Sequence, residues 1–347
     1  MAYTTINKSS DYFNTKIYTG TGSSNALTGV GFEPSLTWIK SRSNPYSHTL
    51  TDAVRGVTKH ISTNNTNDEY TSTTEITSFD SDGFTVGTDA GVNNSSSTFA
   101  SWNWLANGQG SSNTDGSINT TYTSANTTSG FSIIKYTGTG SAGATIGHGL
   151  GVKPAMIIIK NLNITQDWVV YHQAITANKI LYLNMTNDPN DNNVFFNDTE
   201  PTNSLITLGS NSTVNGSGNS HIAYCFAEKK GFSKFGSYTG NGNIDGPFNY
   251  CGFKPAFLML KKTSGTGDWF INDVKRNTFN VVNTQLYPNL NAAEENVNAT
   301  QLDILSNGFK LKGTTSNALN SGNDTYIYLA FAESSIVSSN GVPAAAR

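Results

Sequence analysis

The sequence predicts an all-β protein built from three tandem copies of one antiparallel β-sandwich domain, and three observations lead to this prediction. A short segment with fixed Gly, Pro and Lys positions occurs three times along the 347 residues. Aromatic and β-branched residues are separated by turns rich in Gly, Asn, Ser and Thr, which is typical of strands joined by tight turns. No long stretch has the three-and-four spacing of a helix, apart from a candidate turn or two at residues 290–297.

The repeated segment has the same internal spacing in every copy, with Pro three positions after Gly and Lys nine positions after Gly. The three sets are Gly31, Pro34 and Lys40, then Gly151, Pro154 and Lys160, and then Gly252, Pro255 and Lys261. An almost unbroken apolar run lies between Pro and Lys. A short apolar run that follows a Gly/Pro turn indicates a buried strand. We expect this strand to be central in each domain, and its Lys to mark the return to water.

Two other landmarks recur in step with this segment. Each copy has a Tyr-Thr-Gly entry, at Tyr18, Tyr136 and Tyr238, and each closes on an aromatic strand near Trp102, Tyr224 and Tyr328. The unit recurs at roughly 100 to 120 residues, the size of a domain rather than of a solenoid repeat. We therefore predict a lead-in at residues 1–15, repeats one, two and three at residues 16–106, 107–229 and 230–335, and a tail at residues 336–347.

The lead-in and two hairpins are the next predicted elements. The apolar residues of the lead-in must be buried, either as a first strand or against a partner; they are Tyr3, Ile6, Tyr12 and Phe13. The dipeptides Asp82-Gly83 and Asn307-Gly308 lie between apolar runs. Such dipeptides predict tight hairpins in which Gly has a positive φ.

An Asp and an Arg stand three residues apart in two of the copies. The pairs are Asp52 with Arg55 and Asp273 with Arg276. Because tandem copies would hardly each preserve an active site, we interpret them as structural ion pairs rather than catalytic ones. Repeat two has no Arg at this place and no Gly hairpin near residues 205–206, so it is the most diverged copy.

The segments between the repeats differ in length. Residues 107–130 consist almost entirely of Asn, Gly, Ser and Thr, and they form either a flexible linker or an outer strand of repeat two at residues 117–123. The Thr-Thr-Tyr-Thr sequence favours the strand. Only residues 229–231 separate repeats two and three, so these two should be rigidly docked. The tail cannot fold alone, and a neighbouring subunit is its expected contact.

The composition weakens several classes of function. Charged residues make up 13% of the chain against roughly 25% in an average globular protein, and the net charge is −3. Without a basic patch, nucleic acid and membrane surfaces are poor candidates for partners. The sequence shows no secretory leader and no long apolar run, so we expect synthesis in a cytoplasm without membrane insertion. Cys225 and Cys251 lie at non-equivalent places, which predicts reduced, buried thiols.

No catalytic or cofactor-binding pattern is visible. Glycoside hydrolysis needs two carboxylates across a cleft, and no strand carries such a pair. Four acidic residues of repeat two are interpreted as a solvated loop rather than a calcium site; they are Asp188, Asp191, Asp198 and Glu200. The five His residues show no metal spacing and are interpreted as turn or surface residues: His48, His60, His148, His172 and His221. We therefore predict no catalysis, no cofactor and no metal.

The remaining candidates for binding are two tryptophans. Trp168 and Trp269 each follow an Asp and lie eight residues beyond the Lys of the repeated segment. An exposed Trp at this place could stack on a sugar ring, whereas a buried one belongs to the core. Their recurrence in tandem copies favours the core.

Several local sequences resemble those of a known family. They are the opening Met1-Ala2-Tyr3-Thr4-Thr5-Ile6, the Tyr-Thr-Gly entries, His148-Gly149-Leu150-Gly151, the block Lys234-Phe235-Gly236-Ser237-Tyr238, and the closing Ala-Arg. Taken together, they resemble the tail-fibre-like or appendage structural proteins of tailed bacteriophages, of the marine and cyanophage type. This resemblance covers essentially the whole chain. It implies lectin-like jelly-roll repeats and a place in the virion.

Two classes of function follow as hypotheses. The first is a virion structural or adhesive protein, oligomeric and rod-like, that contacts other virion proteins and touches host glycans through loops such as residues 64–73 or 184–193. A purely architectural adaptor in the capsid surface or tail is a variant of it. The second class is a polysaccharide depolymerase, which would need the missing carboxylate pair. The sequence favours the first class.

Overall fold

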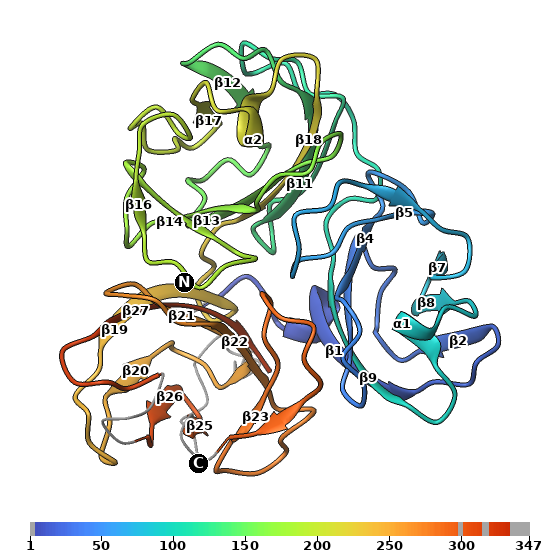
Figure 1. Ribbon diagram of the computed structural model, residues 1–347, viewed down its shortest axis with the longest axis vertical. Coiled ribbons are helices and arrows are strands. Elements are labelled where there is room, and N and C mark those ends of the chain that lie inside the picture. Colours follow the sequence, from blue (N-terminus) through green and yellow to red (C-terminus); the bar gives the residue numbers. More distant parts are fainter. Residues whose placement is uncertain (1–3, 298–300, 314–318, 334–347) are drawn as a thin grey trace.

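The computed structural model describes the chain except for residues 1–3, 298–300, 314–318 and 334–347. Strands make up 41% of the residues and helices 3%, so the predicted all-β class is confirmed. Figure 1 shows three lobes around a common centre, and each lobe contains one repeat. The sheets within every lobe are antiparallel apart from isolated bridges.

Repeat one has a four-stranded main sheet in the order β1, β9, β3, β4 and a second sheet in the order β2, β8, β7. The main-sheet strands are Phe13–Thr19 (β1), Thr98–Trp104 (β9), Leu36–Ser41 (β3) and Thr49–Asp52 (β4). The second-sheet strands are Asn25–Thr28 (β2), Gly83–Val86 (β8) and Ile76–Asp80 (β7). Smaller elements are the 3-10 turn Ser9–Asp11 (η1), the pair Lys59–His60 (β5) and Tyr70–Thr71 (β6), and the helix Ala90–Asn93 (α1).

Repeat two has the same core order within a seven-stranded main sheet, β10, β11, β18, β13, β14, β15, β16. These strands are Tyr122–Asn126 (β10), Phe131–Thr137 (β11), Ser220–Phe226 (β18), Met156–Asn161 (β13), Val169–His172 (β14), Lys179–Tyr182 (β15) and Asn190–Asp191 (β16). The second sheet pairs Ala144–Gly147 (β12) with Leu205–Leu208 (β17), and the helix is Ser212–Asn215 (α2).

Repeat three returns to the arrangement of repeat one, with sheets in the orders β19, β27, β21, β22 and β20, β26, β25. The main-sheet strands are Ser233–Thr239 (β19), Thr325–Ala332 (β27), Pro255–Lys262 (β21) and Trp269–Asp273 (β22). The others are Phe248–Tyr250 (β20), Gly308–Leu311 (β26), Leu302–Leu305 (β25), Thr284–Gln285 (β23) and Glu295–Asn296 (β24).

The thrice-repeated segment forms an interior strand of each main sheet. β3, β13 and β21 each pair with a neighbour on both sides, as the apolar runs predict. The Gly that precedes each strand has a positive φ, which only Gly adopts without strain: 95° at Gly31, 70° at Gly151 and 80° at Gly252. The expectation that the Lys returns to water is wrong. Lys40, Lys160 and Lys261 are fully buried.

The apolar interior has two levels. Each repeat has its own cluster of buried side chains between its two sheets, as with Leu27, Ile39 and Phe84 in repeat one. A further cluster, the shared cluster, draws buried residues from all three main sheets, among them Trp104, Phe226 and Phe331. The repeats therefore close into a compact ring around a common interior (Figure 1), and the end-to-end rod with three separate interiors is not what forms.

The lead-in contributes to this common interior. Ile6 and Phe13 are buried in the shared cluster, and Tyr12 packs against its edge. The ring of Phe13 stacks on Phe331 of repeat three, with centroids 4.9 Å apart. Of the two alternatives for the lead-in, the first strand is the one that forms, and it begins at Phe13. Tyr3 lies outside the described residues.

Both predicted hairpins form, and only one has the predicted positive φ at its Gly. At Gly83, the first residue of β8, φ is 154°, and an added Cβ would lie 1.9 Å from the carbonyl oxygen of Leu27. Gly308, the first residue of β26, does not have the predicted positive φ. Here the close approach of the Asn249 carbonyl oxygen, 2.0 Å from an added Cβ, requires Gly. Backbone crowding is therefore the common cause.

Three smaller expectations have different outcomes. Residues 290–297 contain no helical turn; the short strand β24 lies there instead. The linker does add an outer strand to repeat two, but β10 lies at Tyr122–Asn126, where it pairs with β11, rather than at the predicted residues 117–123. Both cysteines are buried and free, as expected.

Candidate functional site

Trp168 and Trp269 do not offer a face to a sugar. Their exposed fractions are 0% and 1%, because both side chains lie at contacts between repeats. The indole Nε1 of Trp168 donates to the carbonyl oxygen of Ser62 in repeat one at 3.0 Å. That of Trp269 donates to the carbonyl oxygen of Tyr182 in repeat two at 2.9 Å. The glycan-stacking hypothesis for these residues is therefore wrong, since the rings are sealed in the interior.

The third contact of this kind uses a histidine in place of Trp. His48 lies eight residues beyond Lys40, the place that Trp168 and Trp269 take in their repeats. Trp38 donates to His48 Nδ1 at 2.8 Å, so Nε2 carries the ring proton. Nε2 then donates to the carbonyl oxygen of Tyr287 in repeat three at 2.8 Å. Repeats one, two and three are thus linked in a closed ring by three equivalent hydrogen bonds.

The buried lysines reinforce the same boundaries. Lys160 Nζ donates to the carbonyl oxygen of Thr66 across the boundary with repeat one at 3.0 Å. Lys261 Nζ donates to that of Thr186 across the boundary with repeat two at 3.2 Å. Burial lowers the pKa of each of these lysines to about 8. Carbonyl oxygens replace part of the hydration that the ammonium groups lose.

The Asp–Arg residues form ion pairs, as predicted; the structure shows in addition that they are buried and that each pair receives a donor from another repeat. Arg55 Nε lies 2.6 Å from Asp52 Oδ2, with both side chains fully buried. The same carboxylate oxygen accepts a hydrogen bond from Tyr224 of repeat two at 2.8 Å. In repeat three, Arg276 pairs with Asp273 at 2.6 Å, and Trp102 of repeat one donates to that carboxylate at 3.1 Å.

The absence of this pair from repeat two has a local explanation. The strand registers place His172 where Asp52 and Asp273 stand, and Leu329 of repeat three where Tyr224 and Trp102 stand. Leu329 offers no side-chain donor to a carboxylate. His172 instead donates from Nε2 to the carbonyl oxygen of Tyr328 at 3.3 Å, while its Nδ1 accepts from the N–H of Ala174. Repeat two therefore lacks a buried Asp at the one boundary where the neighbouring repeat offers it no side-chain donor.

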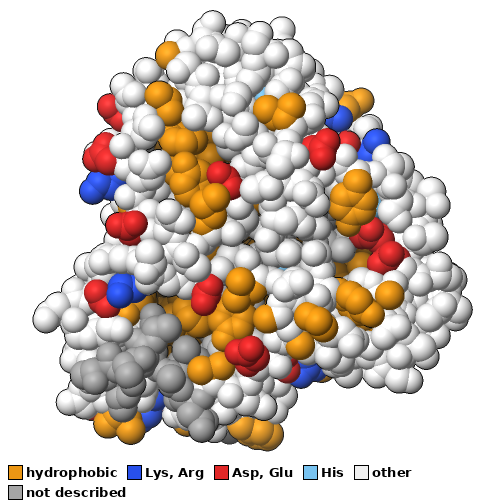
Figure 2. Space-filling model, viewed as in Figure 1, with side chains coloured by type: hydrophobic (Ala, Val, Ile, Leu, Met, Phe, Trp, Pro, Cys, Tyr) orange, Lys and Arg blue, Asp and Glu red, His pale blue; other side chains and the backbone are white. Residues whose placement is uncertain are grey.

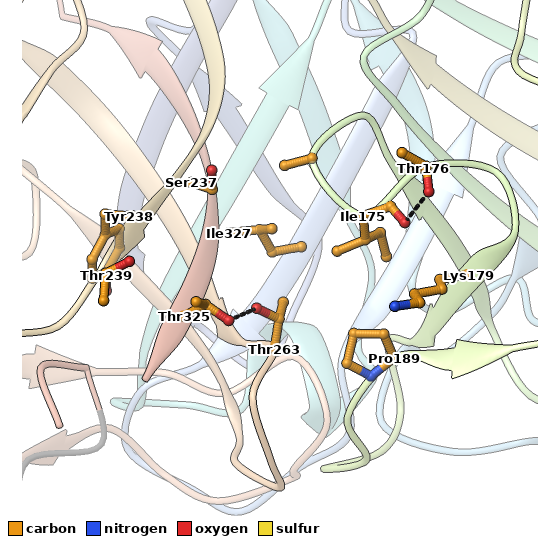
Figure 3. A pocket seen from close by; sticks show the side chains of 11 residues that line it. Ile175, Thr176, Lys179, Pro189, Ser237, Tyr238, Thr239, Thr263, Thr325 and Ile327 are labelled. Carbon is orange, nitrogen blue, oxygen red and sulfur yellow. Dashed lines mark hydrogen bonds between the residues drawn. The ribbon is translucent and has the colours of Figure 1, made fainter. Parts of the chain in front are cut away.

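A groove lies on the surface between repeats two and three. Its volume is about 550 Å³. One wall comes from residues 174–179 and Pro189 of repeat two, and the other from β19, β27 and Thr263 of repeat three (Figure 3). Ile175 and Ile327 face each other across it, and hydroxyl side chains line the rest: Thr176, Ser237, Thr239, Thr263 and Thr325. Of the described residues that line the groove, only Lys179 is charged.

Sequence reasoning missed this groove because its two walls lie far apart along the chain. No residue pattern marks it, and most of its lining side chains are common surface residues. The nearest signal was the short connection between repeats two and three, which predicted their close docking. That docking holds: Gln173 Nε2 of repeat two donates to the carbonyl oxygen of Phe235 in β19 at 2.8 Å.

The loops suggested for glycan contact are only partly free. In the loop at residues 64–73, the Thr66 carbonyl oxygen accepts from the N–H of Gln166 in repeat two, and Glu69 donates its N–H to Leu162. In the loop at residues 184–193, the Thr186 carbonyl oxygen accepts from the N–H of Gly267 in repeat three. The outer strands β6 and β16 of these loops remain exposed. Any adhesive contact of these loops would use the exposed strands β6 and β16, because the other parts of the loops are bonded to a neighbouring repeat.

The acidic residues of repeat two do not gather into a metal site. Glu200 is held by Lys153 at 2.7 Å and by the Tyr171 hydroxyl at 2.6 Å, and Asp191 accepts from Asn178 at 3.4 Å. Within the described residues, no group of three or more His, Cys, Asp or Glu side chains is arranged to hold a metal ion.

One buried titratable cluster lies in repeat one. Glu75 accepts from the Tyr70 hydroxyl at 3.2 Å, and its Oε2 lies 3.7 Å from His60 Nδ1. Burial raises the pKa of Glu75 to about 7 and lowers that of His60 to about 4. His60 Nδ1 is already bonded to Thr51 at 2.6 Å, and Glu75 is 5% exposed. These groups face one another rather than a cleft, so they serve packing.

The surface carries little charge. Figure 2 shows one face on which Lys, Arg, Asp and Glu side chains are scattered singly or in small groups of mixed sign, without a patch of one sign. None of the described residues belongs to a helix that is long and apolar enough to cross a bilayer.

The fold and these contacts define a β-rich protein of three interlocked repeats whose boundaries are crossed by buried hydrogen bonds. The chain belongs to the family described as Domain of unknown function (DUF7483), whose match covers residues 8–335. One match therefore spans all three repeats. Neither a curated protein nor a solved structure matches the chain.

Proposed function

We propose that this protein is a structural component of a bacteriophage virion, placed in a tail fibre or appendage, where it contributes to adhesion to host-surface glycans. The observation that carries the proposal is the closed ring of three repeats, in which a buried hydrogen bond crosses every boundary. At two of the boundaries a buried Asp–Arg pair also accepts a hydrogen bond from the neighbouring repeat. Such a unit resists opening and proteolysis, as a particle exposed outside a cell requires. The resemblance of the local sequences to phage appendage proteins supports the same assignment.

The finer architecture belongs to this proposal. We propose that each two-sheeted repeat is a lectin-like jelly roll, and that the protein forms homo-oligomers with other virion proteins as neighbours. Binding without catalysis is the expected activity. Loops of the outer sheets would supply the glycan contacts, because binding residues are often carried on loops that a rigid scaffold positions.

Two measurements test this assignment. Antibodies against the purified chain should label intact virions at one defined position, and imaging of the particle should place three-lobed density there. Purified protein should also bind host cells or a glycan array and release no reducing ends from the polysaccharide. Virions that lack the chain would overturn the structural role, and release of reducing ends would favour a depolymerase.

An architectural adaptor is the second candidate, and a specific surface favours it. β20 of repeat three exposes Phe248 and Tyr250, at 45% and 59%, where the register of repeat one places Ala26 and Thr28. Exposed aromatic side chains of this kind suit a contact with another protein. Virion labelling without any binding to cells or glycans would decide for this adaptor.

A further inference from the structure

The first strand of the main sheet has different neighbours in repeats two and three. In repeat two, β11 pairs with β18 on one side and with β10 on the other. In repeat three, the equivalent strand β19 pairs with β27, and no described strand pairs with its other edge. The two strands share their Tyr-Thr ends, so Ser237 of β19 corresponds to Lys135 of β11.

The free edge of β19 presents hydrogen-bonding groups to the groove. Gln173 of repeat two donates to the carbonyl oxygen of Phe235, which shows that this residue's main-chain groups face away from β27. Because these groups alternate between the two sides of an antiparallel strand, those of Ser237 and Thr239 face the same way. Both residues are exposed and line the groove. In repeat two, the carbonyl oxygen of the equivalent Lys135 accepts from the N–H of Thr121 at 2.7 Å.

The floor of the groove is apolar, like the surface that β10 covers in repeat two. Tyr122 of β10 packs against the shared cluster. In the groove, Ile175 packs against the same cluster from the boundary of repeats two and three, and Ile327 belongs to it. An aliphatic floor below an open strand edge fits an extended segment that carries one large apolar side chain.

The chain itself does not place a strand here in the way that it does in repeat two. β9 and β11 are joined through residues 105–130, which include β10, whereas β18 and β19 are joined through residues 227–232 only. The shorter connection leaves no length for an added strand.

We propose that the groove between repeats two and three is a strand-acceptor site, in which an extended segment of another protein adds to the edge of β19 as β10 adds to β11. The segment is uncharged, rich in Ser and Thr, and carries one aromatic or large aliphatic residue over Ile175 and Ile327. Main-chain hydrogen bonds to Ser237 and Thr239 supply the pairing, and the apolar side chain supplies specificity. This inference does not depend on the assignment to a virion.

The test uses the full-length protein and a fluorescent peptide with the sequence of residues 117–126, which is uncharged and contains Tyr122. We expect saturable binding by fluorescence anisotropy, and slower hydrogen exchange at the amides of Ser237 and Thr239. The matched control peptide carries Tyr122→Ser and should bind at least about tenfold more weakly, because it loses the apolar anchor.

Two protein variants separate this site from others. Ser237→Pro removes an N–H that faces the groove, a change that an edge strand tolerates, so the protein should stay folded and lose peptide binding. Ile17→Pro makes the equivalent change on β1 of repeat one and should leave binding intact. Circular dichroism confirms the fold of both variants.

The outcomes are distinct. The proposal is overturned if the peptide fails to bind at millimolar concentration, if Ser237→Pro binds as well as the wild type, or if Ile17→Pro abolishes binding. Protection of the same two amides by a neutral oligosaccharide but not by the peptide would assign the groove to a sugar and equally overturn it.

Discussion

At the scale of single residues, one position of each repeat donates a buried hydrogen bond to a neighbouring repeat. Trp168, Trp269 and His48 occupy one position in three copies, and each donates a hydrogen bond across a boundary. A buried carbonyl oxygen that loses such a donor pays the cost of desolvation without compensation. These residues therefore stabilise the fold through their hydrogen bonds as well as through their packing.

The substitution Trp269→Phe tests this role. We expect it to lower the free energy of unfolding by about 0.5–1.5 kcal/mol more than Trp104→Phe, because the Tyr182 carbonyl oxygen loses the hydrogen bond from Trp269 and keeps only the longer one, 3.4 Å, from the Met185 N–H. Trp104 is the matched control: it is 3% exposed, and its Nε1 has no hydrogen-bond partner within the described residues. Urea unfolding measures both variants. Equal losses would show that the hydrogen bond contributes nothing.

The second residue-scale prediction concerns the missing ion pair of repeat two. His172→Asp should destabilise the protein by about 3–5 kcal/mol, because a carboxylate would be buried opposite Leu329 and beside Ile175 without a side-chain donor or a cation. Adding Ile175→Arg should recover part of the loss by restoring the pair found in the other repeats. Thermal unfolding of the single and double variants measures this. A double variant no more stable than His172→Asp would contradict the explanation.

At the scale of elements, the hairpins of the second sheets depend on close backbone contacts. An added Cβ at Gly308 would lie 2.0 Å from the Asn249 carbonyl oxygen and so would push β20 away from β26. We expect Gly308→Ala to cost about 1–3 kcal/mol of stability, as overpacking does in cores. Gly265→Ala is the control, because its Cβ would lie 3.4 Å from Lys262 Cε, a flexible side-chain atom. Urea unfolding measures the free energy of unfolding of both variants. Equal values would show that backbone crowding at Gly308 does not determine the stability of this hairpin.

At the scale of the whole molecule, the interlocked repeats should respond to acid as one unit. Burial lowers the pKa of His48 to about 3 and that of His172 to about 4, below the ordinary value of 6.5. Between each lowered pKa and 6.5, the unfolded chain binds more protons than the folded one. The free energy of unfolding therefore decreases as the pH falls below 6.5. Each group contributes up to about 1.4 kcal/mol per pH unit in this window.

The thermal unfolding temperature at pH 7, 6, 5 and 4 checks this dependence. His48→Gln keeps an N–H for the Tyr287 carbonyl oxygen but cannot titrate, so its curve should be flatter than that of the wild type. Glu75, with its pKa raised to about 7, acts in the opposite direction over the upper part of this range. An unfolding temperature that does not fall with acid, or an unchanged slope in His48→Gln, would contradict the role given to His48.

The shared cluster also predicts how the molecule unfolds. Because Trp104, Phe226 and Phe331 of three repeats pack in one interior, opening any repeat exposes the others. Calorimetry should therefore show a single transition whose van't Hoff and calorimetric enthalpies agree. Three separable domains would instead give several transitions, and that result would contradict the interlocked core.

The sequence by itself determined the local elements of this protein. The spacing of Gly, Pro and apolar residues was enough to predict three interior strands, two hairpins, an added strand in the linker and structural Asp–Arg pairs, since each depends on residues close in the chain. It also favoured the core for Trp168 and Trp269, which are buried. It failed at the rod, at Lys40, Lys160 and Lys261, and at the five His residues expected at turns or the surface, all of which are buried. For Lys160 and Lys261 the reason is that their carbonyl partners lie in another repeat. Only the tertiary structure decided that the main sheets share one interior and that a groove lies between repeats two and three. Burial and hydrogen bonding are set by neighbours in space, and a repeat cannot specify from its own sequence which face its neighbours will cover.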